Sequence, residues 1–295
     1  MTNPTSYFSE PASKLDPTLF EGRLLRSWVR QGVLSLLDGF LAQKYRNSES
    51  WAQAWLAGSG VSYQWSANRQ PGDLDCLVGI NFTQFRKSNT DYTGLSDREI
   101  ADQMNEQFKT ELQPTTENWN GYELTFYVNP KASDIRSIKP YAAYDLKHDE
   151  WTVAPDPTQS APVVPEWDRV ADSDSAFARQ ISTRFNAALN EIQSSRNDAG
   201  RRNAENRLTI AGAQGNALYT EIHGNRSMAF SPEGEGYADF HNYRWQAGKR
   251  SGTIQALRGI REYMKTTVKD SKSNYGVELP DSNTLIRRAA VYRKN

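Results

Sequence analysis

The chain has 295 residues, of which 37% are hydrophobic and 24% are charged, and its 35 basic and 35 acidic residues give a net charge of zero. This length and composition are typical of a soluble protein with one large or two modest domains, and we expect two. No stretch approaches the roughly 18–20 consecutive apolar residues of a membrane span. With Cys76 as the only cysteine and three histidines, an internal disulfide and a typical structural zinc site are excluded. Residues 1–16 lack the basic and apolar regions of a signal peptide, so we expect a cytoplasmic location.

The charged residues are distributed unevenly along the chain. Residues 241–295 contain 12 Lys and Arg against 4 Asp and Glu, which leaves 23 against 31 in residues 1–240. A positive excess of this size favours contact with phosphate or nucleic acid. The alternative is that these cations form solvated helix faces packed against the acidic part of the same chain.

Two helices are predicted at the start of the chain. Asp16 followed by Pro17 resembles a helix N-cap with proline at the first position, and apolar residues at helical spacing predict a helix from there to about Lys44. A second, shorter helix is predicted to begin between Ser48 and Trp51 and to lead into Gly58.

The next elements have clearer patterns. The apolar run from Asp73 to Ile80 predicts a buried strand, and Ser96 with Glu99 forms a capping box that begins a helix continuing to Leu112. Alternation over residues 122–128 predicts another strand. Residues 141–146 and 150–153 are typical of a hairpin at the edge of a sheet.

The pattern changes after residue 153. Four prolines among small polar residues mark a linker at 154–165, which separates a domain of residues 1–153 from one of residues 166–295. In the second domain we expect helices over about 177–192, 201–222 and 239–268, with a glycine-rich loop at 224–236. The predicted fold class is α+β: a small mixed sheet with flanking helices, followed by a mainly helical domain.

One pair of short motifs carries candidate chemistry. In Asp73-Leu74-Asp75 the two carboxylates lie two residues apart on a strand, so they point to one face and can share metal ions. Upstream, Gly58 allows the backbone to approach a phosphate, and Ser59 adds a hydroxyl donor. Paired carboxylates and phosphate donors are what nucleotidyl transfer requires. An Asp-x-Asp motif also occurs in glycosyltransferases that use sugar nucleotides, but that hypothesis gives Gly58 and Ser59 no role.

The order of these motifs resembles the signature of the DNA polymerase β-like nucleotidyltransferase superfamily. In that order an apolar-Gly-Ser sequence is followed by a spacer, here residues 60–72, and then by an Asp-apolar-Asp strand. The resemblance covers about residues 50–153. It implies transfer of a nucleoside monophosphate from a triphosphate such as ATP, release of pyrophosphate, and two Mg²⁺ ions, with Mn²⁺ as an alternative. It also implies a third metal-binding carboxylate on the next strand, where Glu123 is the acid, although aspartate is more usual there. Asp145 is the rival for this position.

The second domain offers further candidates for binding. If it closes over the nucleotide, Lys249 and Arg250 could reach the triphosphate, and an aromatic residue could stack on the base. The alternative places Trp245 in the core and the cations in solvent. For His223 and Arg226 we favour a satisfied polar pair between the domains over a catalytic role. The basic end of the chain favours RNA, such as a transfer RNA, or another polyanion as acceptor. A protein of the same fold that binds a nucleotide or a partner without turnover is the competing hypothesis.

Overall fold

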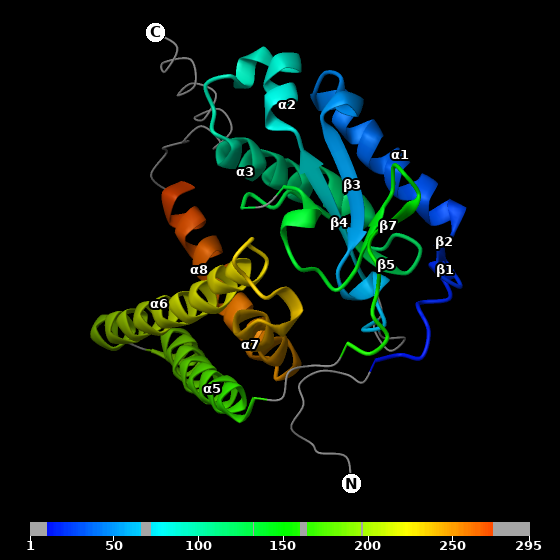
Figure 1. Ribbon diagram of the computed structural model, residues 1–295. Coiled ribbons are helices and arrows are strands. Elements are labelled where there is room, and N and C mark those ends of the chain that lie inside the picture. Colours follow the sequence, from blue (N-terminus) through cyan, green and yellow to red (C-terminus); the bar gives the residue numbers. More distant parts are fainter. Residues whose placement is uncertain (1–10, 66–71, 132, 160–163, 196, 274–295) are drawn as a thin grey trace. The chain divides into compact units, whose positions relative to one another are not determined.

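The computed structural model describes residues 11–65, 72–131, 133–159, 164–195 and 197–273, with side chains as far as residue 266 (Figure 1). The chain divides into two compact units. Among the described residues, the first unit contains those from 11 to 159 together with 230–236, and the second contains those from 164 to 229 and from 237 to 273. The first unit holds a mixed sheet with helices and the second is helical, so the predicted α+β class is confirmed.

The described part of the first unit contains both strands and helices. They are β1 (Phe20–Glu21), β2 (Leu24–Leu25), α1 (Ser27–Lys44), β3 (Ala52–Ala57), β4 (Gly72–Ile80), α2 (Phe82–Ser88), α3 (Asp97–Gln107), α4 (Gln113–Thr116), β5 (Tyr122–Tyr127), β6 (Ala143–Asp145) and β7 (Glu150–Val153).

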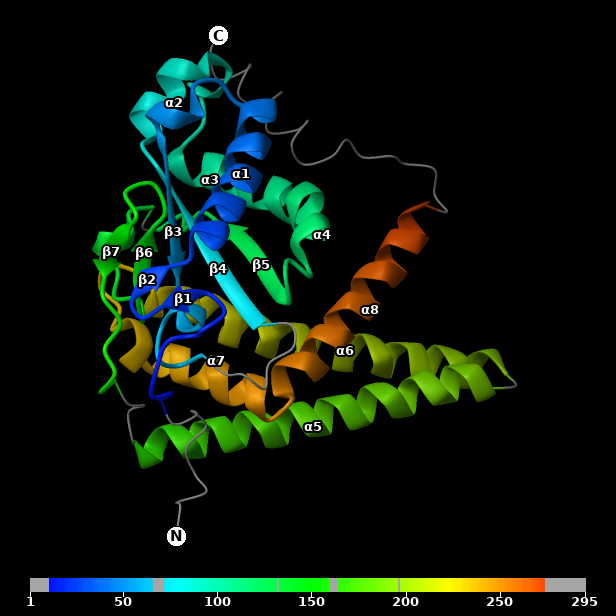
Figure 2. The same ribbon diagram turned by 90° about the vertical axis from the view of Figure 1, so that its right-hand side faces the viewer.

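Five of these strands form one sheet in the order β5-β4-β3-β6-β7. Strands β4 and β5 are parallel, and the other neighbours are antiparallel. In Figure 2 helices α1 and α3 lie on one side of β3, β4 and β5. Side chains from these helices and from that side of the sheet form the main hydrophobic core. The other face of the sheet is therefore the one on which polar side chains can gather.

Strand β4 shows how the sequence assigns the two faces. Leu74, Cys76 and Val78 are fully buried in the main core, whereas the alternate residues Asp73 and Asp75 point to the opposite face. Burial is the main cause of a strongly raised pKa of the Cys76 thiol, and the negative charge of Asp75 adds to it. The predicted strand is confirmed, and its aspartates lie away from the main core.

The predicted helix start at Asp16 is wrong. The chain first forms the small β1–β2 ribbon, reversing at Gly22, which has a φ of 60°, and α1 begins only at Ser27. Asp16 instead accepts hydrogen bonds from the backbone N–H of Thr18 (2.8 Å) and from the hydroxyl of Tyr122 (2.6 Å). The helical spacing of apolar residues arises here because both the ribbon and α1 pack on one core.

The short helix predicted before Gly58 is also wrong. After a single 3₁₀ turn at Ser48–Ser50, the chain continues as β3. This strand lies between β4 and β6, and five of its six residues are buried, so it has no alternation of polar and apolar residues.

The remaining helix and strands predicted for the first unit are present. The capping box of Ser96 and Glu99 begins α3, which passes through a π-helical turn at Phe108–Leu112 into α4. Strands β6 and β7 form the predicted hairpin at one edge of the sheet.

A segment from the second half of the chain completes the first unit. Residues 230–236 belong to it, and Phe230 packs with Trp55 and Ile135 in a small hydrophobic cluster. The side-chain amide of Asn129 donates to the carbonyl oxygen of Phe230 (2.9 Å). Part of the loop expected in the helical domain is thus a component of the sheet unit.

The helical unit is built from four described helices. They are α5 (Pro165–Ser194), α6 (Asp198–Ala229), α7 (Phe240–Arg250) and α8 (Thr253–Ser273). Helices α5 and α6 lie side by side over most of their length (Figure 2). Their shared core with α7 and α8 contains Ile181, Phe185, Trp245 and Leu257, so Trp245 occupies the core position that the alternative gave it.

Three boundaries in this unit differ from the predictions. Helix α5 begins at Pro165, inside the predicted linker and well before residue 177. Helix α6 continues through Gly224 to Ala229, so the predicted loop begins later; an added Cβ at Gly224 would meet no atom within 4 Å. The single helix predicted over 239–268 is divided into α7 and α8 at Ser251 and Gly252, where Gly252 has a φ of 76°. No helix in the described part of the chain is long and apolar enough to cross a membrane.

An ion pair lies inside the helical unit. Arg244 donates from Nε to Oδ2 of Asp174 (2.5 Å) and from Nη2 to Oδ1 (2.8 Å), and its third nitrogen, Nη1, bonds to Oε1 of Glu221 (2.6 Å). The Arg244 and Asp174 side chains are only 10% and 12% exposed. The hydrogen bond to Asp174 is the largest cause of a raised pKa of Arg244, so the arginine stays charged and links α5, α6 and α7.

Candidate functional site

The loop after β3 holds the first predicted site residues. Gly58 has a φ of 90° and a ψ of −159°, a conformation that is essentially restricted to glycine. Its N–H donates to the carbonyl oxygen of Ala142 (3.2 Å), which ties the loop to the residue preceding β6. Ser59 then begins a 3₁₀ turn, and its carbonyl oxygen accepts from the N–H and the hydroxyl of Ser62 (3.1 and 3.0 Å). The loop is therefore a defined turn with a glycine-specific backbone.

This turn lies directly beside the second aspartate of β4. Ala57, the last residue of β3, pairs with Asp75, and a Cβ on Gly58 would come within 3.3 Å of Oδ2 of Asp75. A Cβ on Gly60 would lie 2.4 Å from the carbonyl oxygen of Asp73, so the turn also packs tightly on β4. The structure thus brings together the two motifs that the sequence separates by residues 60–72.

Strand β5 supplies polar groups on the same face. Asp73 pairs with Glu123 and Asp75 with Thr125 in the parallel register, which places each pair about 4.8 Å apart in the strand-to-strand direction. The Thr125 hydroxyl donates to Oδ1 of Asp75 (2.8 Å). The contact between Thr125 and Asp75 depends on the parallel register of β4 and β5, which the sequence does not reveal.

The carboxylate of Glu123 is held by a residue of α4 rather than by a neighbouring strand. Its Oε1 accepts a hydrogen bond from Nε2 of Gln113, the first residue of α4, at 3.4 Å. Glu123 therefore shares a face with Asp73 and Asp75 while its carboxylate contacts α4. Gln113 follows the π-helical turn at Phe108–Leu112, so the helical spacing of the sequence does not predict this contact.

Asp145 lies on the same face but two strands away from Asp75. It pairs with Trp55 of β3, at the level of Leu77 rather than of Asp75. Its Oδ1 accepts from the N–H groups of Lys147 and His148 (2.8 and 2.9 Å), and its Oδ2 lies 2.9 Å from Nδ1 of His148. These contacts give Asp145 a structural role in the β6–β7 turn.

Lys249 and Arg250 are not part of this unit. They are exposed in the last turn of α7, in the helical unit. Their predicted role at the triphosphate remains a prediction.

The residues present fit Mg²⁺ as partial ligands. Within the ranges that the structure describes, no three His, Cys, Asp or Glu side chains gather closely enough to hold a metal ion. However, Mg²⁺ in nucleotide sites is commonly bound by only one or two carboxylates, with water and substrate phosphates completing its shell. Asp73 and Asp75, on one face beside the Gly58 turn, provide such a pair.

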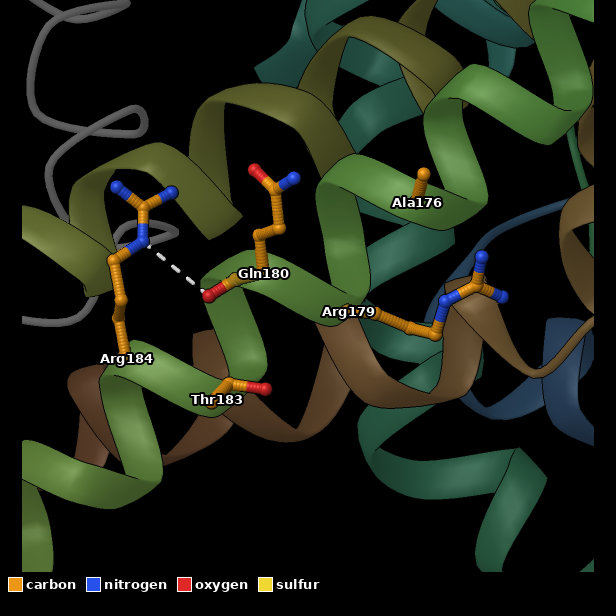
Figure 3. Close-up of a pocket in the computed structure, with 5 residues that line it drawn as sticks. All are labelled: Ala176, Arg179, Gln180, Thr183 and Arg184. Carbon is orange, nitrogen blue, oxygen red and sulfur yellow. Dashed lines mark hydrogen bonds between the residues drawn. The ribbon is translucent and has the colours of Figure 1, made fainter.

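A pocket of about 620 Å³ lies elsewhere, on α5, and it contains none of the predicted site residues (Figure 3). Five residues of that helix line it: Ala176, Arg179, Gln180, Thr183 and Arg184. In Figure 3 the Arg179 and Arg184 side chains extend in different directions, so their guanidinium groups do not converge on a common ligand. Arg184 bonds to the carbonyl oxygen of Gln180 (3.3 Å) and Arg179 to the hydroxyl of Ser175 (3.0 Å). The carboxylate face of the sheet therefore remains the better candidate site.

Comparison with known proteins gives no match to a protein-family model, to a curated protein sequence or to a solved structure.

Proposed function

We propose that this protein is a magnesium-dependent nucleotidyltransferase that moves a nucleoside monophosphate from a nucleoside triphosphate to an acceptor hydroxyl and releases pyrophosphate. One observation carries the proposal: the glycine-specific turn at Gly58 lies against Asp75, on the sheet face that also holds Asp73. Phosphate-binding backbone and paired carboxylates are thereby adjacent, as the resemblance to the polymerase β-like superfamily requires.

In this proposal the turn binds the phosphates. Gly58 lets the main chain approach a phosphate oxygen closely, and Ser59 contributes its hydroxyl. The close packing of Gly60 on β4 fixes the position of the turn relative to the aspartates. A fixed position matters because nucleotidyl transfer depends mainly on holding the reacting groups in line.

Asp73 and Asp75 hold the metal ions in this proposal, and Glu123 is the third ligand if its carboxylate turns from Gln113 toward them. When bound, the ions neutralise charge on the triphosphate and lower the pKa of the attacking hydroxyl. Thr125 orients Asp75 through its hydrogen bond to Oδ1, which leaves Oδ2 on the side of the Gly58 turn. The acceptor we propose is RNA or another polyanion, because of the basic excess in residues 241–295.

The test is pyrophosphate release from each of the four common nucleoside triphosphates, with Mg²⁺ or Mn²⁺ and a pool of total RNA as acceptor. We expect release with the unaltered chain and none with Asp73→Asn plus Asp75→Asn. The matched control is Asp91→Asn plus Asp102→Asn, two exposed acids of the same unit, which should not change the rate. Release that persists in the Asp73 and Asp75 variant would refute the assignment.

A second pair of variants tests the third carboxylate. Glu123→Gln should lower the rate at least tenfold, while Asp145→Asn should reduce stability more than the rate, because Asp145 holds the β6–β7 turn. The reverse result would exchange the two roles.

The alternative is a protein that binds a nucleotide without turnover. The observation that favours it is that no three metal-binding side chains gather within the described residues. Stabilisation by a triphosphate and Mg²⁺ in a thermal-unfolding assay, with no pyrophosphate release from any triphosphate, would support this alternative over the enzyme.

A further inference from the structure

A cluster of cations and aromatic rings lies in the helical unit, outside the site described above. On α6, the ring of His223 is stacked on that of Tyr219 at 5.4 Å and 11°, and it meets the edge of Trp245 from α7 at 5.2 Å and 67°. The guanidinium of Arg226 lies 5.3 Å from the Trp245 ring, and that of Arg261 from α8 lies 4.9 Å from the Tyr219 ring. All these residues belong to the helical unit, whereas the sequence predicted a polar pair between domains for His223 and Arg226.

The buried rings hold the arginines rather than serving as binding platforms themselves. Tyr219 and Trp245 are 5% and 3% exposed, so their faces are covered by His223 and by the two guanidinium groups. Stacking on the Tyr219 ring fixes the plane of the Arg261 guanidinium without using its outer N–H groups as donors. The Nε of Arg261 is buried without a hydrogen-bond partner. The ring contact therefore positions this guanidinium, and its outer N–H groups rather than the buried Nε are the ones that an anion would contact.

The positive charge continues along α8. Arg258, Arg261 and Lys265 follow one another at spacings of three and four residues, so they share a helix face over roughly 10 Å. Among the described ion pairs of the helical unit, none involves Arg258 or Arg261. Glu262 is the only acid between residues 253 and 269. Partial burial, and then the positive charges of Arg226, Arg261 and Arg258, lower the pKa of His223.

We propose that this surface, formed by His223, Arg226, Arg258, Arg261 and Lys265, binds the phosphodiester backbone of single-stranded RNA. A row of cations about 10 Å long fits a chain that carries a negative charge at every nucleotide better than it fits one phosphate group. Guanidinium planes and the exposed imidazole also provide surfaces on which unpaired bases stack. RNA binding by this surface does not depend on the proposed function. The further step, that the bound RNA is the acceptor, does rest on it.

The test is the affinity of the full chain for a fluorescent oligouridylate, measured by anisotropy over a series of salt concentrations without nucleoside triphosphate. A length of about 20 nucleotides exceeds the roughly 4–16 nucleotides bound by common single-strand-binding folds. Arg258→Gln plus Arg261→Gln should weaken binding at least tenfold. It should also reduce the slope of log K against log salt by about 1.4, which corresponds to about 0.7 for each lost phosphate contact.

Two further variants separate this effect from folding and from net charge. Arg258→Gln plus Lys265→Gln changes two exposed side chains outside the described ring contacts, and it should weaken binding similarly. Arg169→Gln plus Arg202→Gln removes the same charge from exposed positions on α5 and α6, and it should leave the affinity and the slope unchanged. Equal losses in all three variants, or an RNA affinity that does not fall with salt, would overturn the proposal.

The experiment also distinguishes other ligands and the catalytic proposal. Binding to phosphatidylserine vesicles or to ATP, with no binding to the oligouridylate, would refute an RNA surface. The Asp73→Asn plus Asp75→Asn variant should bind the oligouridylate as the unaltered chain does, because its changes lie in the other unit. Salt-sensitive RNA binding without pyrophosphate release would therefore reject the enzyme and retain the RNA surface.

Discussion

Replacing Gly58 with alanine tests the part of the site on which the proposed function depends most. The backbone at Gly58 has a φ of 90° and a ψ of −159°, and residues with a side chain pay about 1–3 kcal/mol in such a region. The new Cβ would also lie 3.3 Å from Oδ2 of Asp75, so the carboxylate or the turn must move by a few tenths of an ångström. We expect a loss of about 2 kcal/mol in the free energy of unfolding of the first unit, or roughly 4–8 °C in Tm, together with at least a tenfold slower pyrophosphate release.

Stability and activity need separate measurements in this variant. Hydrogen exchange of peptides from β3 and β4 reports the opening of the sheet itself, and pyrophosphate release below the unfolding temperature reports the site. Gly39→Ala in α1 is the matched control, because an added Cβ there meets no atom within 4 Å and should stabilise the helix by about 0.5–1 kcal/mol. If Gly58→Ala leaves both exchange and activity unchanged, the turn does not have the strained geometry on which this reasoning depends.

Three further predictions concern individual side chains. Thr125→Val removes the 2.8 Å hydrogen bond to Asp75, worth about 1.5–3 kcal/mol for a charged acceptor, and it should slow pyrophosphate release about tenfold while Thr125→Ser does not. Arg244→Leu leaves Asp174 buried without its partner and should destabilise the helical unit by about 3–5 kcal/mol in urea unfolding, whereas adding Asp174→Leu should restore most of that loss. The pKa of His223 is lower in the folded unit than its ordinary value of 6.5. As the pH falls below 6.5, the unfolded chain therefore binds more protons than the folded one, and the free energy of unfolding decreases. Urea midpoints should therefore be constant above about pH 6.5 and decline below it, less steeply for His223→Gln; an identical decline in both proteins would show that His223 is not responsible.

The sequence predicted those elements whose patterns are local. Strand β4 and helix α3 carry complete signals of their own, an apolar run after Pro71-Gly72 and a capping box, and both were found. The hairpin of β6 and β7 was also predicted, although it contributes only 3 and 4 residues to the sheet. These patterns involve residues that are close in sequence, so they can be recognised without knowledge of the tertiary structure.

The wrong predictions concern elements whose pattern is set by tertiary packing. Strand β3 is buried on both faces, so Ala52–Ala57 shows no alternation and its alanines and leucine favour a helix on local grounds. The division between α7 and α8 depends on the backbone of Gly252, which a helical pattern of side chains does not reveal. For the candidate site, the sequence indicated the face that Asp73 and Asp75 share, but the contact of Gly58 with Asp75 required the antiparallel pairing of β3 and β4.

The position of Cys76 allows opening of the sheet unit to be measured by thiol modification. The thiol is fully buried in the main core, to which helix α1 also contributes side chains. Its raised pKa keeps it in the unreactive thiol form, so alkylating reagents reach a thiolate only after β4 separates from its surroundings. Because Cys76 is the chain's only cysteine, the rate at which it is modified in the native protein reports how often β4, the strand that carries Asp73 and Asp75, opens. A nucleotide that binds at β4 should lower the rate of Cys76 modification. Nucleotide ligands can therefore be screened by mass spectrometry of the modified protein, without knowledge of the acceptor.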